Sequence, residues 1–333
     1  MYTMLPDSPP HLPVMPVEVR ELAALEPGSI VIDGTFGAGG HARLLAAGLA
    51  GDGTYIGIDR DPSAEARFRD FAEEVAPLAT RFLRMPFPDA FSLLLEEGVS
   101  ADAVILDVGV SSMQLDEPER GFAYAHDAPL DMRMDPSSGA GAAELLATAD
   151  LNELTRILRE YGEEKFARPI AKAIVRRRED GDPITHTADL VEVIRSALPG
   201  GGRVLKGGHP AKRTFQALRV AVNDELGMLD RGLDLALELL KPDGRLVVMA
   251  FQSLEDRIVK RRIEAWSGSC TCPPGLPVCR CGALTHAASL TRGAQKPTAA
   301  EVAENPRSAS TRLRAVRRIE PPRLVRDEYG AAL

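Results

Sequence analysis

The chain has 333 residues, of which 44% are hydrophobic and 26% charged, with a formal net charge of −8. This length and composition allow one large domain or two ordinary ones, and they exclude a wholly disordered chain. No run approaches the roughly 18 consecutive apolar residues that a membrane span requires. Residues 1–10 lack the basic start and apolar middle of a signal peptide, so we expect a cytoplasmic protein with no membrane association.

The charge is unevenly distributed along the chain. Residues 1–160 contain 11 Arg, no Lys and 27 Asp or Glu, whereas the remainder carries 29 Lys and Arg against 21 Asp and Glu. Two interpretations stay open: an acidic catalytic half with a basic half that faces phosphates, or two solvated surfaces of opposite sign.

The first third of the chain alternates short apolar strands with helical stretches. We predict strands over 29–33, 54–59 and 103–107, and helices over 41–50 and 64–78. Strands that alternate with helices indicate a parallel sheet, and ligands of such sheets bind at the carboxyl ends of the strands. Each predicted strand ends there in an acidic residue, namely Asp33, Asp59 and Asp107.

A Gly-rich turn follows the first predicted strand and reads Asp33-Gly34-Thr35-Phe36-Gly37-Ala38-Gly39-Gly40-His41. Glycines let the backbone approach a ligand closely, and the N-terminus of the next helix presents free N–H groups. Asp59 lies 20 residues beyond Gly39, the spacing at which an acidic residue meets ribose hydroxyls. The pattern favours a nucleoside cofactor over a plain tight turn.

The details of this turn favour S-adenosylmethionine (SAM) over a dinucleotide. The glycines do not form a clean G-x-G-x-x-G pattern, and SAM carries a sulfonium cation instead of a pyrophosphate. Acidic residues at strand ends, here Asp33 and Asp107, suit such a cation. Ordinary strand-end or capping acids remain the alternative.

The middle of the chain changes in character. Residues 142–198 show amphipathic helical patterns and no convincing strand, and the sheet pattern resumes with a helix over 215–240 and a strand over 244–251. We therefore predict an α/β domain of residues 1–115 and 215–333 that is interrupted by an inserted helical domain of residues 116–214. The tail from residue 267 reads as irregular, with a final strand-like segment at 313–319.

Two segments of the middle region have unusual composition. A long loop over 107–135 is dense in Gly, Ser, Gln, Asp and Met; we expect its Met side chains to be exposed, which favours a functional loop. Further on, four basic residues recur at helical spacing and share one face: Lys165, Arg168, Lys172 and Arg176. Such a row suits a phosphate backbone; a solvated helix paired with Glu163 and Glu164 is the alternative.

These segments together resemble the ribosomal RNA small subunit methyltransferase H family, whose members methylate the exocyclic N4 of a cytidine in small-subunit rRNA. The similarity runs from His11 to Ser308 and so covers nearly the whole chain. Its blocks are residues 11–15, the Gly-rich turn, and residues 106–135, 161–178, 209–226, 251–260 and 304–308.

The resemblance implies a Rossmann-like SAM-dependent methyltransferase with an inserted all-helical domain for substrate recognition. Its substrate would be 16S rRNA in the 30S ribosomal subunit. Carried over residue by residue, the cofactor contacts would be Gly39, Gly40, His41, Asp59, Phe87, Asp107 and Gln114. The segment Arg84-Met85-Pro86-Phe87 departs from the usual His-x-x-Phe form, and Ala128 stands where the family more often has Gly.

The chemistry that this family performs is an in-line displacement, which needs neither a covalent enzyme nucleophile nor a catalytic metal. The site must align the amine with the methyl group and accept hydrogen bonds from its protons. The target base must also leave any stack. We assign the acceptor role to Asp107 with the backbone of residues 108–112, and a cofactor-binding role to His41. The Asp/Asn/Ser-Pro-Pro-aromatic motif of DNA amino-methyltransferases is replaced here by Asp107-Val108-Gly109-Val110.

Four cysteines form two C-x-C units: Cys270, Cys272, Cys279 and Cys281. They are too few for a disulfide framework, and they fit either one structural zinc or reduced thiols in a surface loop. Two rival functions stay open, a methyltransferase of the same fold acting on DNA, protein or a small molecule, and a non-catalytic RNA-binding or assembly factor. A homodimer is left open as well.

Overall fold

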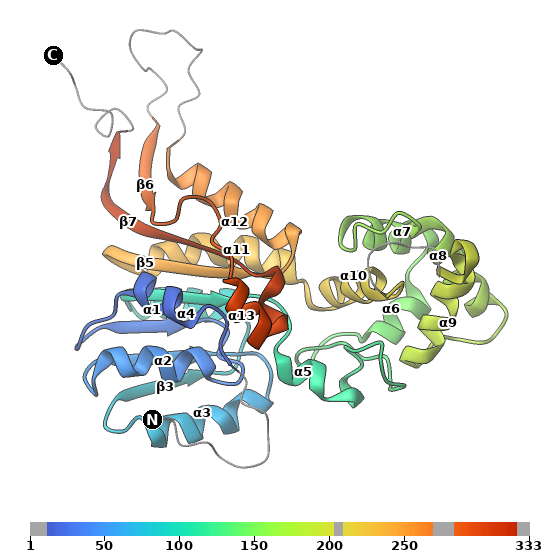
Figure 1. Cartoon of the computed structure of the whole chain (residues 1–333), viewed down its shortest axis with the longest axis horizontal. Coiled ribbons are helices and arrows are strands. Elements are labelled where there is room, and N and C mark those ends of the chain that lie inside the picture. The colour runs from blue at the N-terminus through green and yellow to red at the C-terminus, as the bar shows by residue number, and fades with distance from the viewer. Residues whose placement is uncertain (1–11, 203–208, 269–282, 325–333) are drawn as a thin grey trace, which may run out of the picture. The chain divides into compact units, whose positions relative to one another are not determined.

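The structure, a computed structural model, describes residues 12–202, 209–268 and 283–324. The chain divides into two compact units (Figure 1). One, here called the sheet unit, consists of Met1–Gly109 and Leu226–Leu333, and the other, the helical unit, of Val110–Glu225. The sheet unit is thus assembled from two stretches of chain that the helical unit separates in sequence.

Seven strands in the described part of the sheet unit form one mixed sheet in the order β3-β2-β1-β4-β5-β7-β6. The strands are β1 (Ile30–Asp33), β2 (Thr54–Ile58), β3 (Ala79–Leu83), β4 (Ala101–Asp107), β5 (Leu240–Ala250), β6 (Leu284–Ser289) and β7 (Arg312–Leu324). The first five are parallel, and β7 runs antiparallel to both of its neighbours. The strand order reverses between β1 and β4, which is where open α/β sheets bind their ligands.

The three predicted strands of the first third are confirmed, but β3 was not predicted. The helix α3 (Ser63–Glu74) ends before Pro77, four residues short of the predicted end, and β3 then pairs with β2. β3 is an edge strand whose residues are mostly exposed or half-buried. An edge strand needs little apolar sequence, so its hydrophobic signal is weak.

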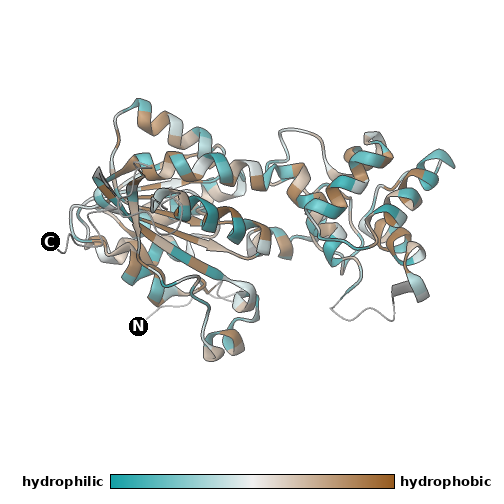
Figure 2. Ribbon diagram, turned by 90° about the horizontal axis from the view of Figure 1, so that it is seen from above, coloured by the Kyte–Doolittle hydropathy of each residue, from teal (hydrophilic) through white to brown (hydrophobic). Residues whose placement is uncertain are grey.

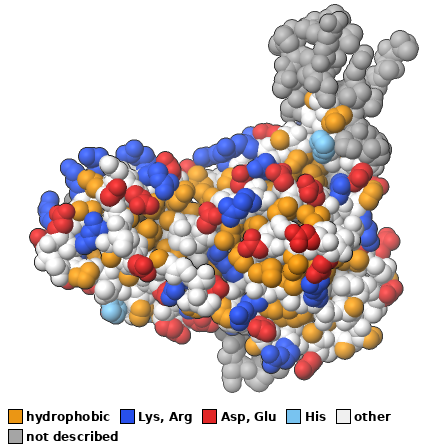
Figure 3. Space-filling view, turned by 180° about the vertical axis from the view of Figure 1, so that it is seen from behind, with side chains coloured by type: hydrophobic (Ala, Val, Ile, Leu, Met, Phe, Trp, Pro, Cys, Tyr) orange, Lys and Arg blue, Asp and Glu red, His pale blue; other side chains and the backbone are white. Residues whose placement is uncertain are grey.

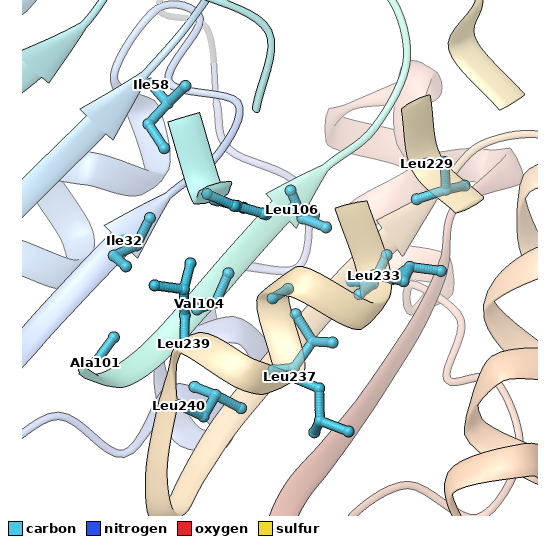
Figure 4. Packing of buried hydrophobic residues seen from close by; sticks show 14 of the residues in the cluster. Ile32, Ile58, Ala101, Val104, Leu106, Leu229, Leu233, Leu237, Leu239 and Leu240 are labelled. Atoms are coloured by element: carbon cyan, nitrogen blue, oxygen red, sulfur yellow. The ribbon is translucent and has the colours of Figure 1, made fainter. Parts of the chain in front are cut away.

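Helices cover both faces of the sheet. On one face lie α1 (Pro16–Ala23), α2 (Gly40–Leu49) and α3; on the other lie α4 (Phe87–Glu96), α11 (Glu225–Leu239) and α12 (Ser253–Trp266). Alternate residues of β4 point to opposite faces. Val104 packs with the second set (Figure 4), whereas Ile105 packs with the first. Two further short elements, α13 (Ala299–Glu304) and the 3-10 helix Pro306–Ser310, precede β7.

The helical unit is built from short amphipathic helices, which carry hydrophobic and hydrophilic residues side by side (Figure 2). Its α-helices in the described residues are α5 (Ser112–Asp116), α6 (Ala142–Thr148), α7 (Leu151–Glu160), α8 (Ala167–Glu179), α9 (Thr187–Ala197) and α10 (Lys212–Asn223). Two 3-10 helices, Pro118–Arg120 and Pro199–Gly202, complete it.

The single helix predicted over 215–240 is wrong. The chain leaves the helical conformation at Asp224, whose φ is 47°, so α10 and α11 are separate helices. Phe215 and Leu218 of α10 are buried in the core of the helical unit, whereas Leu229 and Leu233 of α11 are buried against the sheet. The helical unit therefore extends beyond the predicted insertion at both ends.

The expectation of exposed Met side chains in the 107–135 loop is also wrong. Leu130, Met132 and Met134 are 2%, 0% and 8% exposed, because alternate residues of this segment point into the core of the helical unit. The side chain of Asn223 holds the segment in place by donating to the Met132 carbonyl and accepting from the Met134 N–H, at 2.7 and 2.8 Å.

This anchoring makes Asn223 a strong test of the loop's structural role. Asn223→Ala leaves the Met132 carbonyl and the Met134 N–H unsatisfied in the core, so we expect a loss of about 2–4 kcal/mol in the free energy of unfolding. Denaturant unfolding measures it. The exposed Asn152 of α7 provides the matched control, Asn152→Ala, with an expected change below about 1 kcal/mol. Equal effects for both variants would contradict the assignment.

The acidic and basic halves of the sequence do not correspond to the two units. The sheet unit takes residues from both halves, and the helical unit holds 16 Lys and Arg against 19 Asp and Glu. A separate basic half that faces phosphates therefore does not exist in this fold, and any such surface must be local. In the described residues, no helix combines the length and the apolar character that a membrane crossing demands.

Candidate cofactor and active site

The Gly-rich turn joins β1 to α2 at the switch point of the sheet. Its backbone is held by two hydrogen bonds, from the Gly34 N–H to the Ile105 carbonyl and from the Phe36 N–H to the Ile58 carbonyl, both 2.9 Å long. Gly39 has φ 75°, and a Cβ at this position would lie 2.9 Å from the Phe36 ring. The turn thus requires glycine here, and no side chain caps the first N–H groups of α2.

Asp33 is enclosed beneath this turn. Its carboxylate accepts the Tyr55 hydroxyl at 2.7 Å and the Thr35 N–H at 3.0 Å, and the residue is only 2% exposed. Burial raises the pKa of Asp33, and the hydrogen bond from Tyr55 opposes that rise. Asp33 therefore shapes the turn from inside, and the expectation that it meets a cation directly is not supported.

Asp59 links the turn to the end of β2. One carboxylate oxygen accepts the Gly37 N–H and the other accepts the Asp61 N–H, both at 2.8 Å. Burial raises the pKa of Asp59 to about 6, with these hydrogen bonds acting against it. Each oxygen keeps acceptor capacity for a further donor such as a hydroxyl. The geometry therefore suits the predicted recognition of a ribose.

His41 and Asp107 form a pair at the switch point. The His41 Nε2 lies 2.8 Å from the Val14 carbonyl, and its Nδ1 lies 3.5 Å from an Asp107 carboxylate oxygen. A carbonyl can only accept, so Nε2 must carry a proton. Nδ1 is therefore the ring nitrogen that faces the Asp107 carboxyl group.

Asp107 is the strand-end acid that has an unsatisfied hydrogen-bond acceptor. Its backbone N–H donates to the Thr35 hydroxyl at 2.6 Å, but its carboxylate Oδ1 is buried and has no hydrogen-bond partner among the described residues. Burial raises the pKa of Asp107 to about 6; the charge of His41 lowers it and that of Asp33 raises it. The side chain as a whole keeps 28% of its surface exposed although Oδ1 itself is buried, so a bound group can contact the exposed part of this side chain. An orphaned carboxylate beside a glycine cradle fits a cationic nucleoside cofactor.

Phe87 and Gln114 lie in different surroundings. Phe87 begins α4; its Cβ borders Gly34 of the turn, whereas its ring packs against α11, where a Cβ added at Gly232 would overlap it. Gln114 belongs to the helical unit, where its side chain accepts the Ser111 N–H and completes the capping box of α5. The structure thus gathers Gly39, Gly40, His41, Asp59 and Asp107 in the sheet unit with Phe87 at their border, and it gives Gln114 a local role in the helical unit.

Several residues of this site were not predicted from the sequence. Tyr55 holds the Asp33 carboxylate, and the Thr35 hydroxyl accepts the backbone N–H of Asp107. Tyr55 could have been found from the sequence, because it is a tyrosine within an otherwise apolar strand. At the end of β5, Glu255 accepts the N–H groups of Phe251 and Gln252 at 2.9 and 3.0 Å. The amide oxygen and nitrogen of the Gln252 side chain are buried, and neither has a hydrogen-bond partner within the described ranges.

Comparison with known proteins identifies the family of this chain. Residues 8–319 match the model of the MraW methylase family. The chain belongs to the MraW methylase family. Curated relatives include proteins named ribosomal RNA small subunit methyltransferase H from Symbiobacterium thermophilum, 48% identical, and from Geobacter sulfurreducens, 49% identical. These alignments cover 93% of this chain and 97% and 99% of the relatives. A third so named, from Acidothermus cellulolyticus, is 49% identical over 96% of this chain and 97% of its own length.

A metal-binding site, if present, would be separate from the cofactor site of this MraW methylase. Within the described ranges, no three or more His, Cys, Asp or Glu side chains are grouped as a metal site would require. The cluster Cys270, Cys272, Cys279 and Cys281 lies outside the described residues. The structural zinc therefore stays a prediction.

Proposed function

We propose that this MraW methylase transfers a methyl group from SAM to the exocyclic N4 of a cytidine in 16S rRNA, acting on the small ribosomal subunit in the cytoplasm. The observation that carries the proposal is the Asp107 carboxylate, unsatisfied and paired with His41 at the switch point of the sheet. Relatives named for small-subunit rRNA methylation support the substrate class.

SAM would be held by the Gly-rich turn and by Asp59, and when bound it supplies a methyl group made electrophilic by its sulfonium. The uncapped N-terminus of α2 and the free acceptor capacity of Asp59 suit the polar ends of such a molecule. Asp107 would add a negative charge that favours the binding of a sulfonium cation.

Asp107 would also act on the amine that is methylated. The lone pair of a cytosine N4 is delocalised into the ring, so an acceptor for its protons increases its nucleophilicity as charge develops. The ionised Asp107 carboxylate can accept such a hydrogen bond. His41, held by the Val14 carbonyl, places its Nδ1 3.5 Å from this carboxylate and so bounds the space on that side of it.

The proposal is tested by the position of the transferred methyl group. The full-length protein is incubated with tritiated SAM and, separately, 30S particles, free 16S rRNA and duplex DNA, and labelled nucleosides are identified by mass spectrometry. We expect N4-methylated cytidine from the 30S particles or the rRNA. Label confined to DNA or protein would favour another methyltransferase. SAM binding without transfer to any of them would favour an assembly factor.

The raised carboxyl pKa values predict a pH dependence. Asp107, with a pKa of about 6, is protonated below that pH and then cannot accept a proton. Single-turnover methyl transfer at saturating SAM should therefore fall about tenfold per pH unit below about 6. SAM affinity should decrease over the same range, because the pKa of Asp59 is also about 6. A rate that is flat from pH 7 to pH 5 would contradict the assignment of Asp107.

The stability of the cofactor-free protein should change in the opposite direction. Asp59 and Asp107 bind protons more tightly in the folded chain than at their ordinary value of 3.8. Between pH ~4 and ~6 the folded state therefore holds more protons than the unfolded state, and the free energy of unfolding decreases as the pH rises. These two carboxyl groups thus lower the stability of the folded chain at the pH values at which they are ionised, as function requires.

A further inference from the structure

A row of four basic side chains follows one face of α8. Lys165, just before the helix, and Arg168, Lys172 and Arg176 within it are all exposed, whereas Ile170 and Ile174 on the opposite face are buried in the core. We call the four the α8 basic row. Their separations of three and four residues place them along one line on the helix surface, about 16 Å long at 1.5 Å per residue.

The neighbouring arginines have structural tasks that set them apart from the row. Arg177 forms ion pairs with Asp182, Asp189 and Glu192. Arg178 donates to the carbonyls of Leu146, Ala147 and Ala149 at the C-terminal end of α6, at 2.9 to 3.0 Å. The run Arg176-Arg177-Arg178 is therefore divided: two members hold the helical unit together, and Arg176 points away from it with the row.

No hydrogen bond or ion pair to the row is found in the part of the chain that the structure describes. This is notable because the helical unit contains more acidic than basic residues, 19 against 16. The predicted partner Glu164 is 7% exposed, and its carboxylate accepts the Phe166 N–H at the start of α8. Glu164 therefore does not neutralise the row, and the other predicted partner, Glu163, forms no ion pair with the row within the described residues.

An unneutralised row lowers the stability of its own helix. Like charges three or four residues apart repel by about 0.2–0.5 kcal/mol per pair, and the row contains three such neighbouring pairs. A polyanion would reverse this penalty by replacing repulsion with attraction. A membrane surface fits less well, because the large exposed hydrophobic residues in the described chain, Leu12, Val17 and Leu284, lie outside the helical unit.

We propose that the α8 basic row binds the phosphate backbone of the RNA substrate. This inference rests on the proposed function and adds the surface by which the RNA is held. Because the helical unit as a whole has more acidic than basic residues, its positive charge must be concentrated in a limited patch such as this row. Lys and Arg side chains gather along the edge of this unit at the left of Figure 3. Phosphate contacts of this kind position a substrate without reading its bases.

The test removes the four charges together, with Lys165→Gln, Arg168→Gln, Lys172→Gln and Arg176→Gln in the full chain. Binding of a fluorescent 16S rRNA transcript is measured by anisotropy between 50 and 300 mM salt. Four phosphate contacts contribute about 3 to the slope of log affinity against log salt, so we expect the slope to decrease by about that amount. The Kd at 50 mM salt should rise at least tenfold.

A matched control removes four exposed arginines of the sheet unit: Arg20→Gln, Arg69→Gln, Arg261→Gln and Arg292→Gln. It changes the net charge equally, and its salt slope should stay within about one unit of the wild-type value. Circular dichroism and SAM binding should be unchanged in both quadruple variants. In methylation assays, the row variant should raise the KM for RNA and leave kcat at saturating RNA nearly unchanged.

The outcomes separate this inference from the proposed function. If the wild-type protein binds and methylates RNA while the row variant keeps its affinity and salt slope, the row is not the RNA-binding surface. Equal losses in the row and control variants would show a nonspecific effect of net charge and overturn the inference as well. If the wild-type protein neither binds nor methylates RNA, the proposed function itself fails.

Discussion

Asp107→Asn should slow methyl transfer by ~10²–10⁴-fold, the range that a positioned proton acceptor contributes. The amide has nearly the same shape as the carboxyl group, so the fold should be kept, but it loses the negative charge that faces His41 Nδ1 at 3.5 Å. Single-turnover kinetics at saturating SAM measure the chemical step. The residual rate should no longer fall below pH 6, because the titrating group has been removed.

Asp102→Asn, the same substitution at the other end of β4, is the control. Asp102 accepts the Ile30 N–H and the Lys241 ammonium group at 2.7 and 2.8 Å, far along the strand from the site. Asp102→Asn should reduce stability modestly and keep the rate of transfer within about threefold of wild type. A comparable rate loss in both variants would mean that Asp107 acts through the fold, and a normal rate in Asp107→Asn would remove it from the mechanism.

Asp59→Ala should weaken SAM binding by ~10–100-fold, because hydrogen bonds to a charged group contribute about 1.5–3 kcal/mol. Isothermal titration measures this directly. The chemical step at saturating SAM should change little, in contrast to Asp107→Asn. Asp59 also holds the Gly37 N–H of the turn, so Asp59→Asn, which keeps one acceptor oxygen, should give an intermediate loss.

The exposed Asp70 of α3 offers a comparison with the same loss of charge, since Asp70→Ala should leave SAM affinity unchanged. If Asp59→Ala bound SAM with wild-type affinity, the assignment of this acid to the ribose would be wrong. If its affinity were lost together with its thermal stability, the turn would be the cause. The amide oxygen of Asp59→Asn can still accept the Gly37 N–H, although the bond to the Asp61 N–H is then lost, so a stable Asp59→Asn variant with weakened SAM binding separates the ribose contact from the turn.

What the sequence alone determined lies in signals that act over short stretches of chain. The glycines of the turn, the apolar strands β1, β2 and β4, and the acids at their ends were predicted correctly, because each depends on residues adjacent in sequence. The parallel arrangement then followed from the alternation of strands and helices. The same signals were too weak to predict the edge strand β3. They also gave no indication of the break at Asp224, so that α10 and α11 were predicted as one helix.

Tertiary structure alone decided what similar residues do. Asp33 and Asp107 have the same place at a strand end, but Tyr55 encloses the first, while the second keeps an unsatisfied oxygen beside His41. Arg176 and Arg177 are neighbours, but within the part of the chain that the structure describes Arg177 alone of the two meets carboxylates. The physical reason is the same in each case: charge and hydrogen bonding depend on partners that are distant in sequence, and only the folded chain brings those partners within reach.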